Sequence, residues 1–142
     1  GKFDEIGAIL FTIRNGKLGK PGVGSPYAEK ILIFKEGQRL PIHYHIEKTE
    51  DIINRGEGTM EMRFYLKKED GSVDYESDVT NHTFGAKMGD GPLIAGEVSK
   101  VNDDNTDNYF AEPTARFADI EEDEPVLYPL CNEYDKWFPK ND

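Results

Sequence analysis

The sequence holds one cysteine and few basic residues, and each shortage excludes a class of protein. With Cys131 alone, the chain cannot form an internal disulfide, so a reducing compartment is the simpler expectation. Lys and Arg number 17 against 28 Asp and Glu, which gives a formal charge of −11. An acidic chain repels nucleic acid and anionic membranes, so we expect neither as a partner. A neutral small molecule fits this charge better.

Long hydrophobic runs are also missing. No stretch of about 18 apolar residues occurs, so the sequence predicts no membrane span. The first residues, GKFDE, lack the basic and apolar regions of a signal peptide, and we expect a cytoplasmic location. The chain has 142 residues, with eight Phe, seven Tyr and one Trp as core material. This length predicts one domain that covers residues 1–142.

Histidine is scarce too, yet two of the three histidines stand together. His43 and His45 are two residues apart, so on a β-strand their side chains point to the same face. Glu50 follows five residues after His45 and can return to the same site if the chain turns between them. Two imidazoles and a carboxylate suit a borderline or hard divalent metal, so the pattern predicts a metal site. The alternative from the pattern alone is a solvated strand edge with two exposed histidines.

The third histidine and an acidic stretch are further candidates. His82 lies far along the chain and is available to the same cluster, although alone it would be interpreted as a hydrogen-bonded structural histidine. Residues 101–108 are strongly polar and include Asp103, Asp104 and Asp107. This stretch lacks the spaced Gly and the terminal Glu of an EF-hand calcium loop. We therefore interpret it as a solvated or substrate-facing loop.

Short apolar segments, separated by Gly, Pro and Asp turns, fill most of the chain. They indicate strands, because little helical periodicity accompanies them. The expected strands cover residues 6–14, 27–34, 39–45, 59–66, 92–99 and 126–131, and another begins near residue 73. In the second of these, Lys30, Leu32 and Phe34 share one face. The pattern predicts an all-β sandwich or barrel, and a metal cluster inside it fits a double-sheet jelly roll of the cupin type.

Five blocks of the sequence resemble the D-lyxose ketol-isomerases, a family of cupin-fold sugar isomerases. The blocks are YAEKI at 27–31, PIHYH at 41–45, KTEDIINRG at 48–56, GEVSKVNDD at 96–104 and LCNEY at 130–134. The resemblance implies a metal-dependent aldose–ketose isomerase that interconverts D-lyxose and D-xylulose through an enediol, with D-mannose and D-fructose as a further pair. The implied fold is a cupin-type double-stranded β-helix, a jelly-roll barrel, either complete or incomplete.

The resemblance also implies the metal ligands and the metal. The family's four ligands are two His, a Glu and a later His, and they fall on His43, His45, Glu50 and His82. The usual metal of the family is manganese, which suits a site of histidine and carboxylate ligands.

Catalytic roles follow from the same blocks. The resemblance places the catalytic carboxylate on Glu133 and a catalytic lysine on Lys30. Glu97, the other carboxylate expected at a strand end, is the alternative base. Without the resemblance, Lys30 fits a surface lysine and Glu133 fits a surface carboxylate equally well. The acidic loop is implied to hold the hydroxyls of the sugar through Asp103, Asp104 and Asp107.

One segment departs from the family pattern. Members usually carry a hairpin and a strand containing Pro-Gly before the last histidine, whereas here residues 77–80 run straight into Asn81 and His82. About 20 to 30 residues, equivalent to two or three strands, are absent. Either the chain is a shortened variant or a segment is missing from this sequence. A real shortening could put His82 out of reach of the metal and leave the barrel open or completed by a partner.

Two other functions stay open on the sequence alone. One is a non-catalytic metal-binding or sugar-binding barrel. The other is a metal-dependent oxygenase, because fold does not fix function and His43, His45 and Glu50 alone satisfy the 2-His-1-carboxylate pattern. Manganese with His82 coordinated favours the isomerase, and iron with His82 remote favours the oxygenase. We also expect a homodimer, because small cupin barrels commonly associate and lost strands would leave an edge to cover.

Overall fold

The regular secondary structure of the described residues is almost all β-strand. The computed structural model describes residues 2–56, 58–77, 83–88, 91–101, 103, 105–117 and 120–137. Its strands are β1 (Ile9–Gly16), β2 (Gly24–Phe34), β3 (His43–Tyr44), β4 (Glu50–Asn54), β5 (Met60–Lys67), β6 (Val73–Asp74), β7 (Thr83–Met88), β8 (Leu93–Lys100) and β9 (Tyr109–Phe110). A 3₁₀ helix, η1 (Cys131–Glu133), leads into the short α1 (Tyr134–Trp137). No helix in these described residues is long and apolar enough to cross a membrane.

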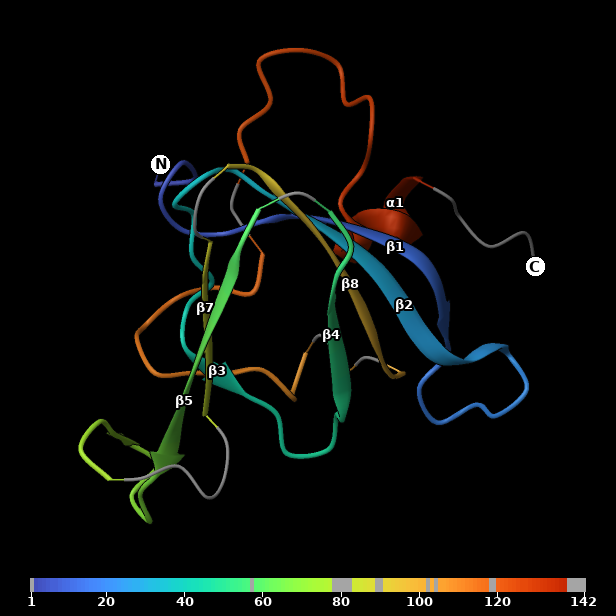
Figure 1. Ribbon diagram of the computed structural model, residues 1–142. Coiled ribbons are helices and arrows are strands. Elements are labelled where there is room, and N and C mark those ends of the chain that lie inside the picture. The colour runs from blue at the N-terminus through green and yellow to red at the C-terminus, as the bar shows by residue number, and fades with distance from the viewer. Residues whose placement is uncertain are drawn as a thin grey trace.

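The strands form two sheets (Figure 1). One has four strands in the order β1-β2-β8-β4, and the other has five in the order β6-β5-β7-β3-β9. Figure 1 shows β5, β7 and β3 on one side of the fold and β1, β2, β8 and β4 on the other. All pairings between these strands are antiparallel. The predicted all-β class is confirmed, and the arrangement is consistent with a cupin-type fold.

Strand β2 separates an inner face of the four-stranded sheet from an outer one. Every second residue along its C-terminal half is buried: Ala28, Lys30, Leu32 and Phe34. This alternation confirms the predicted shared face of Lys30, Leu32 and Phe34. Strand β8 pairs with β2, so that Leu32 lies opposite Ala95 and Lys30 lies opposite Glu97. Residues opposite each other on paired strands share a face of the sheet.

The apolar core lies at one end of this inner face. It consists of Leu32, Phe34, Leu93 and Ala95, each at most 4% exposed. Partly buried side chains pack against it from other parts of the chain: Ala8, Leu10, Leu40 and Met60. We call the four buried residues the apolar end. Removing their apolar surface from water supplies the main favourable term in folding.

The structure corrects the sequence expectation on the C-terminal side. The predicted strand at 126–131 is wrong, because Leu127 and Tyr128 are almost fully exposed and η1 begins at Cys131. Pro129 has no N–H to donate to a strand ladder, and none of the described strands pairs with this segment. Conversely, β4, β7 and β9 were absent from the expected strands. Strands β4 and β9 pair with strands more than 40 positions away in the sequence, whereas β7 pairs with β5 at separations of 18–28 positions and also with β3.

Candidate metal centre

His43, His45 and Glu50 converge, as their spacing predicts. His43 begins β3, His45 follows this strand, and Glu50 begins β4. One potential ligand atom from each residue lies within 4.8 Å of the others. Because β3 and β4 belong to different sheets, the turn between them carries the Glu50 carboxylate back to the histidines. The cluster therefore lies where the two sheets meet through a short connection.

Backbone carbonyls orient both imidazole rings. Nδ1 of His43 lies 2.7 Å from the carbonyl oxygen of Pro41, and Nδ1 of His45 contacts the carbonyl oxygen of Asp107. A carbonyl only accepts, so Nδ1 of each neutral ring carries the proton and Nε2 holds the lone pair. Burial lowers the pKa of His43, and the Pro41 contact only partly opposes this. The orientation of the two rings and the lowered pKa of His43 both suit metal binding, which needs a neutral, oriented imidazole.

Nε2 of His45 gives the direct test of whether these residues fit a metal. It is buried and has no hydrogen-bond partner among the described residues. Oε2 of Glu50 lies 3.9 Å away, beyond hydrogen-bonding distance. Buried polar atoms nearly always find a partner, so an imidazole nitrogen facing a carboxylate across this gap fits a divalent cation. His82, the predicted fourth ligand, lies outside the described residues.

A chain of buried charges leads from Glu50 into the interior. Nζ of Lys48 lies 2.6 Å from Oε2 of Glu50 and 2.9 Å from Oε1 of Glu97. Nζ of Lys30 lies 2.8 Å from the same oxygen of Glu97. The side chains of Lys30, Glu97 and Lys48 are at most 7% exposed. We call Lys30, Glu97, Lys48 and Glu50 the charged end, because Lys30 and Glu97 follow the apolar end along the same two strands.

The charged end makes Glu97 a weak base. Burial alone would raise the pKa of Glu97, but the charges of Lys48 and Lys30 and the hydrogen bonds they donate outweigh burial and lower it to about 2. A carboxylate with so low a pKa takes up a proton poorly at neutral pH. This weighs against Glu97 as the catalytic base. Burial lowers the pKa of Lys30, and the negative charge of Glu97 opposes that effect.

The two predicted catalytic residues lie in different surroundings. Lys30 is 3% exposed on the inner face, so it is not a surface lysine. Glu133 ends η1, and its partly exposed carboxylate lies 3.6 Å from Nζ of Lys136. The described contacts join Lys30 to the candidate metal centre through Glu97 and Lys48. The Glu133 carboxylate is described in an ion pair with Lys136, which does not link it to that centre.

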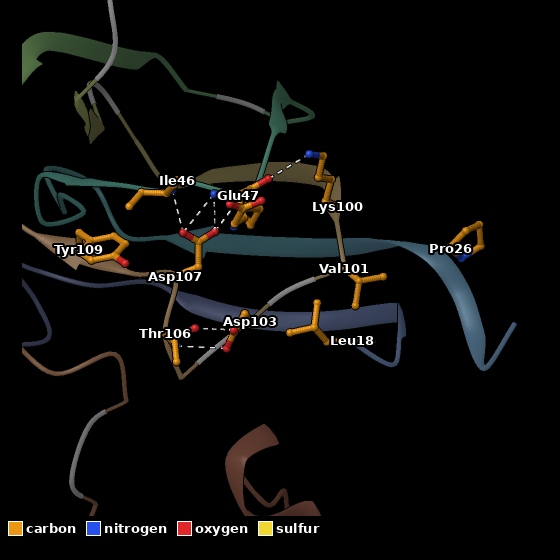
Figure 2. A pocket seen from close by; sticks show the side chains of 11 residues that line it. Leu18, Pro26, Ile46, Glu47, Lys100, Val101, Asp103, Thr106, Asp107 and Tyr109 are labelled. Carbon is orange, nitrogen blue, oxygen red and sulfur yellow. Dashed lines mark hydrogen bonds between the residues drawn. The ribbon is translucent and has the colours of Figure 1, made fainter. Parts of the chain in front are cut away.

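The acidic loop has a structural task in addition to its predicted one. The buried carboxylate of Asp107 accepts hydrogen bonds from the backbone N–H groups of Ile46, Glu47 and Lys48, at 2.7–3.3 Å. Burial would raise the pKa of Asp107, but these N–H donors outweigh it and lower the pKa. Figure 2 shows this carboxylate facing the backbone at Ile46 and Glu47. Asp107 therefore fixes the turn between His45 and Glu50.

Asp103 and Asp107 also line a surface pocket of about 500 Å³. Figure 2 shows Thr106 beside Asp103, together with the apolar side chains of Leu18 and Val101. The Asp103 carboxylate accepts hydrogen bonds from the N–H groups of Asn105 and Thr106. Asp104 lies outside the described residues.

Lys48 is the site residue that the sequence reasoning missed. It lies between the histidine pair and Glu50 in the KTED block, where a lysine ordinarily belongs to a solvated turn. Its inward direction depends on the turn that Asp107 holds from 59 residues away. The only local signal was its position within the proposed ligand motif.

Fold and site together define a class: an all-β protein, consistent with a cupin-type fold, with a partly buried cluster of two histidines and a glutamate that could hold a metal ion. A family model described as D-lyxose isomerase matches residues 1–88 and 77–134. Two curated relatives, from Serratia proteamaculans and Escherichia coli O157:H7, are both named D-lyxose/D-mannose isomerase. Each is 37% identical over 161 or 163 residues, which cover 93% of this chain and 71% of the relative. The chain therefore belongs to the D-lyxose isomerase family, and the predicted enzyme class, a sugar isomerase, is confirmed.

The comparisons fit a shortened chain. The two segments that match the family model overlap at residues 77–88, the stretch where the sequence predicts the shortening. The aligned region spans 161 residues but takes in only 93% of these 142 residues, which leaves roughly 30 positions of the relative without a counterpart. This agrees with the predicted absence of two or three strands.

Proposed function

We propose that this chain is a metal-dependent aldose–ketose isomerase that interconverts D-lyxose and D-xylulose through an enediol. D-mannose and D-fructose form a further substrate pair. The observation that carries the proposal is the convergence of His43, His45 and Glu50 within 4.8 Å, in a chain of the D-lyxose isomerase family. The curated relatives with the name D-lyxose/D-mannose isomerase support both substrate pairs.

The metal of this proposal is Mn²⁺, held by His43, His45 and Glu50, with His82 as the fourth ligand. The two Nδ1–carbonyl contacts and the unpartnered Nε2 of His45 support a site of this type. When bound, a divalent ion would polarise the sugar carbonyl as a Lewis acid and offset the negative charge that develops on oxygen.

The chain's own side chains would move the protons. In this proposal the Glu133 carboxylate takes the proton from one of the two carbons C1 and C2 and returns it to the other, as general base and then general acid. The low pKa of Glu97 supports Glu133 over Glu97 for this task. Lys30, whose ammonium is buried, would stabilise negative charge on a sugar oxygen or assist proton transfer to it.

The sugar hydroxyls would be held by the acidic loop through Asp103, Asp104 and Asp107. Asp103 and Asp107 line one pocket, which supports a shared task. A carboxylate has about four lone-pair sites. Backbone N–H groups already make four hydrogen bonds to Asp107, so a sugar hydroxyl would bind it by sharing a site with one of these donors.

The test is conversion of sugar by the purified chain. The chain would be incubated with D-lyxose, D-mannose or D-xylulose in the presence of Mn²⁺, and the sugars would be separated and quantified. We expect lyxose and xylulose to interconvert, and conversion to disappear when the metal is removed. A chain that binds Mn²⁺ but converts none of the three sugars would contradict the proposal and favour a non-catalytic binding protein.

Three further features belong to the same proposal. We infer a homodimer, a single domain over residues 1–142 and a cytoplasmic location, all from the sequence. The dimer is checked by measuring the mass of the protein in solution at micromolar concentration, where a monomer would contradict it.

A further inference from the structure

Lys48 has no task in the proposed reaction, yet it occupies the centre of the charged end. Its ammonium lies between two carboxylates, 2.6 Å from Oε2 of Glu50 and 2.9 Å from Oε1 of Glu97. The side chain is 5% exposed. Its backbone N–H is also held, at 2.8 Å, by Oδ2 of Asp107. Both the backbone and the charged tip of Lys48 are therefore fixed by buried contacts.

One oxygen atom connects this lysine to the candidate ligands. Oε2 of Glu50, which accepts from Lys48, is also the oxygen that lies 3.9 Å from Nε2 of His45. A divalent cation held by His43, His45 and Glu50 would therefore share the Glu50 carboxylate with a positively charged ammonium. Little water reaches these side chains, so repulsion between the two cations is weakly screened.

Glu97 acts in the opposite direction. Its Oε1 accepts from both Lys48 and Lys30, so one negative charge faces two positive ones. If this carboxylate were neutral, the full charges of both lysines would act on the neighbouring centre. The two residues therefore have opposite electrostatic effects on a cation at Glu50, although they contact each other.

We propose that Lys48 is a built-in counter-cation of the candidate metal centre: it holds the Glu50 carboxylate in place but weakens the binding of a divalent cation, and Glu97 restores part of that affinity by neutralising Lys48. The inference rests on the proposed metal centre and not on the sugar or the reaction. In this inference Lys48 lowers the metal affinity of the centre, and Glu97 raises it by offsetting part of the charge of Lys48.

The experiment is a calorimetric titration of Mn²⁺ into metal-stripped protein. Lys48→Met removes the charge and keeps the apolar stem, and we expect the Kd for Mn²⁺ to fall by about tenfold or more. Glu97→Gln keeps the shape and removes the negative charge, and we expect the Kd to rise by about 10- to 100-fold. Lys48→Arg retains the charge and should keep the Kd near that of the wild type. In the Lys48→Met background, Glu97→Gln should raise the Kd for Mn²⁺ by a smaller factor than in the wild type.

Opposite signs separate this proposal from a purely structural role, in which both variants would weaken binding. The matched controls are Lys35→Met and Glu29→Gln, which change the net charge equally but belong to ion pairs outside the charged end. Both should leave the Kd within about twofold of the wild type.

Folding of each variant is checked by circular dichroism. If Lys48→Met does not fold, Lys48→Gln, which removes the charge but keeps a hydrogen-bond donor, takes its place with the same expected direction. A folded variant without the charge that binds Mn²⁺ no more tightly than the wild type overturns the inference. Wild-type protein that takes up no Mn²⁺ overturns the proposed centre itself, and this inference with it.

Discussion

The apolar end and two members of the charged end, Lys30 and Glu97, lie on the same two strands and contrast sharply. On β2 and β8, Leu32 faces Ala95 across the ladder, and two residues further along Lys30 faces Glu97. All four are buried to a similar degree. The strand pairing therefore directs both pairs inward in the same way, and only the chemistry of the side chains makes one pair a core and the other part of a site.

The energetics of the two ends differ accordingly. Burying the apolar side chains stabilises the fold by about 25 cal/mol per Å² of apolar surface. Buried ion pairs gain little net stability, because desolvation of the charges offsets most of their attraction. Apolar side chains of similar volume in place of the charged end would therefore give the fold about the same stability. Glu50, one member of the charged end, lies 3.9 Å from His45, which connects this end to the candidate metal centre.

His45→Ala, next to the charged end, should have the largest effect. It removes the proposed ligand whose Nε2 has no hydrogen-bond partner among the described residues, so we expect metal uptake to be lost and isomerase turnover to fall to background. Elemental analysis of purified protein before and after the change measures the uptake. Leu32→Ala serves as the control at the apolar end and should keep the metal. Unchanged metal content in His45→Ala would rule out the assigned ligands.

Glu133→Gln tests the proposed catalytic base, which belongs to neither the apolar end nor the charged end. It keeps the shape and hydrogen bonding of the side chain but removes the carboxylate proposed as the base, so turnover should fall by roughly 10²–10⁴ with metal content unchanged. Initial rates of lyxose conversion at saturating Mn²⁺ measure this. Glu97→Gln, assayed under the same saturating conditions, is the comparison. Near-normal turnover in Glu133→Gln together with a large loss in Glu97→Gln would reassign the base to Glu97.

Leu32→Ala should mainly affect stability. Truncating a buried leucine removes apolar contacts and leaves a cavity, so the free energy of unfolding should drop by about 2–5 kcal/mol. Urea denaturation followed by circular dichroism provides the value. Ile33→Ala, the neighbouring residue on the outer face, should cost clearly less. Equal losses for both variants would mean that the inner face is not the main core.

Acid should affect the charged end more than the apolar end. The folded-state pKa of Glu97, about 2, lies below its ordinary value of 4.5, so its contribution to stability is present above about pH 4.5 and is lost as the pH falls toward 2. A shift of this size corresponds to a loss of about 3 kcal/mol. The unfolding free energies of the wild type and of Glu97→Gln are measured across this pH range, and the difference between them gives the contribution of Glu97. Parallel pH curves for the two proteins would contradict the assignment.

Much of the inner face could be predicted from single strands. Alternation along residues 27–34 placed Lys30 with Leu32 and Phe34, because side chains on a strand alternate between faces with a period of two. The same rule placed His43 and His45 together. The segment 126–131 was mispredicted because an apolar run becomes a strand only if another strand pairs with it. Strand β4 was missed because its pairing with β8 involves residues more than 40 positions away.

By itself, the sequence determined the all-β class, the three convergent metal-ligand candidates and the family, because each depends on local spacing or on blocks of residue identity. Only the tertiary structure decided that Lys48 turns inward, that Glu97 accepts from two lysines, and that Asp107 holds the turn before Glu50. These contacts join residues 49 to 67 positions apart. The direction of a buried charge is set by partners that the fold brings to it, and no local pattern of residues encodes those partners.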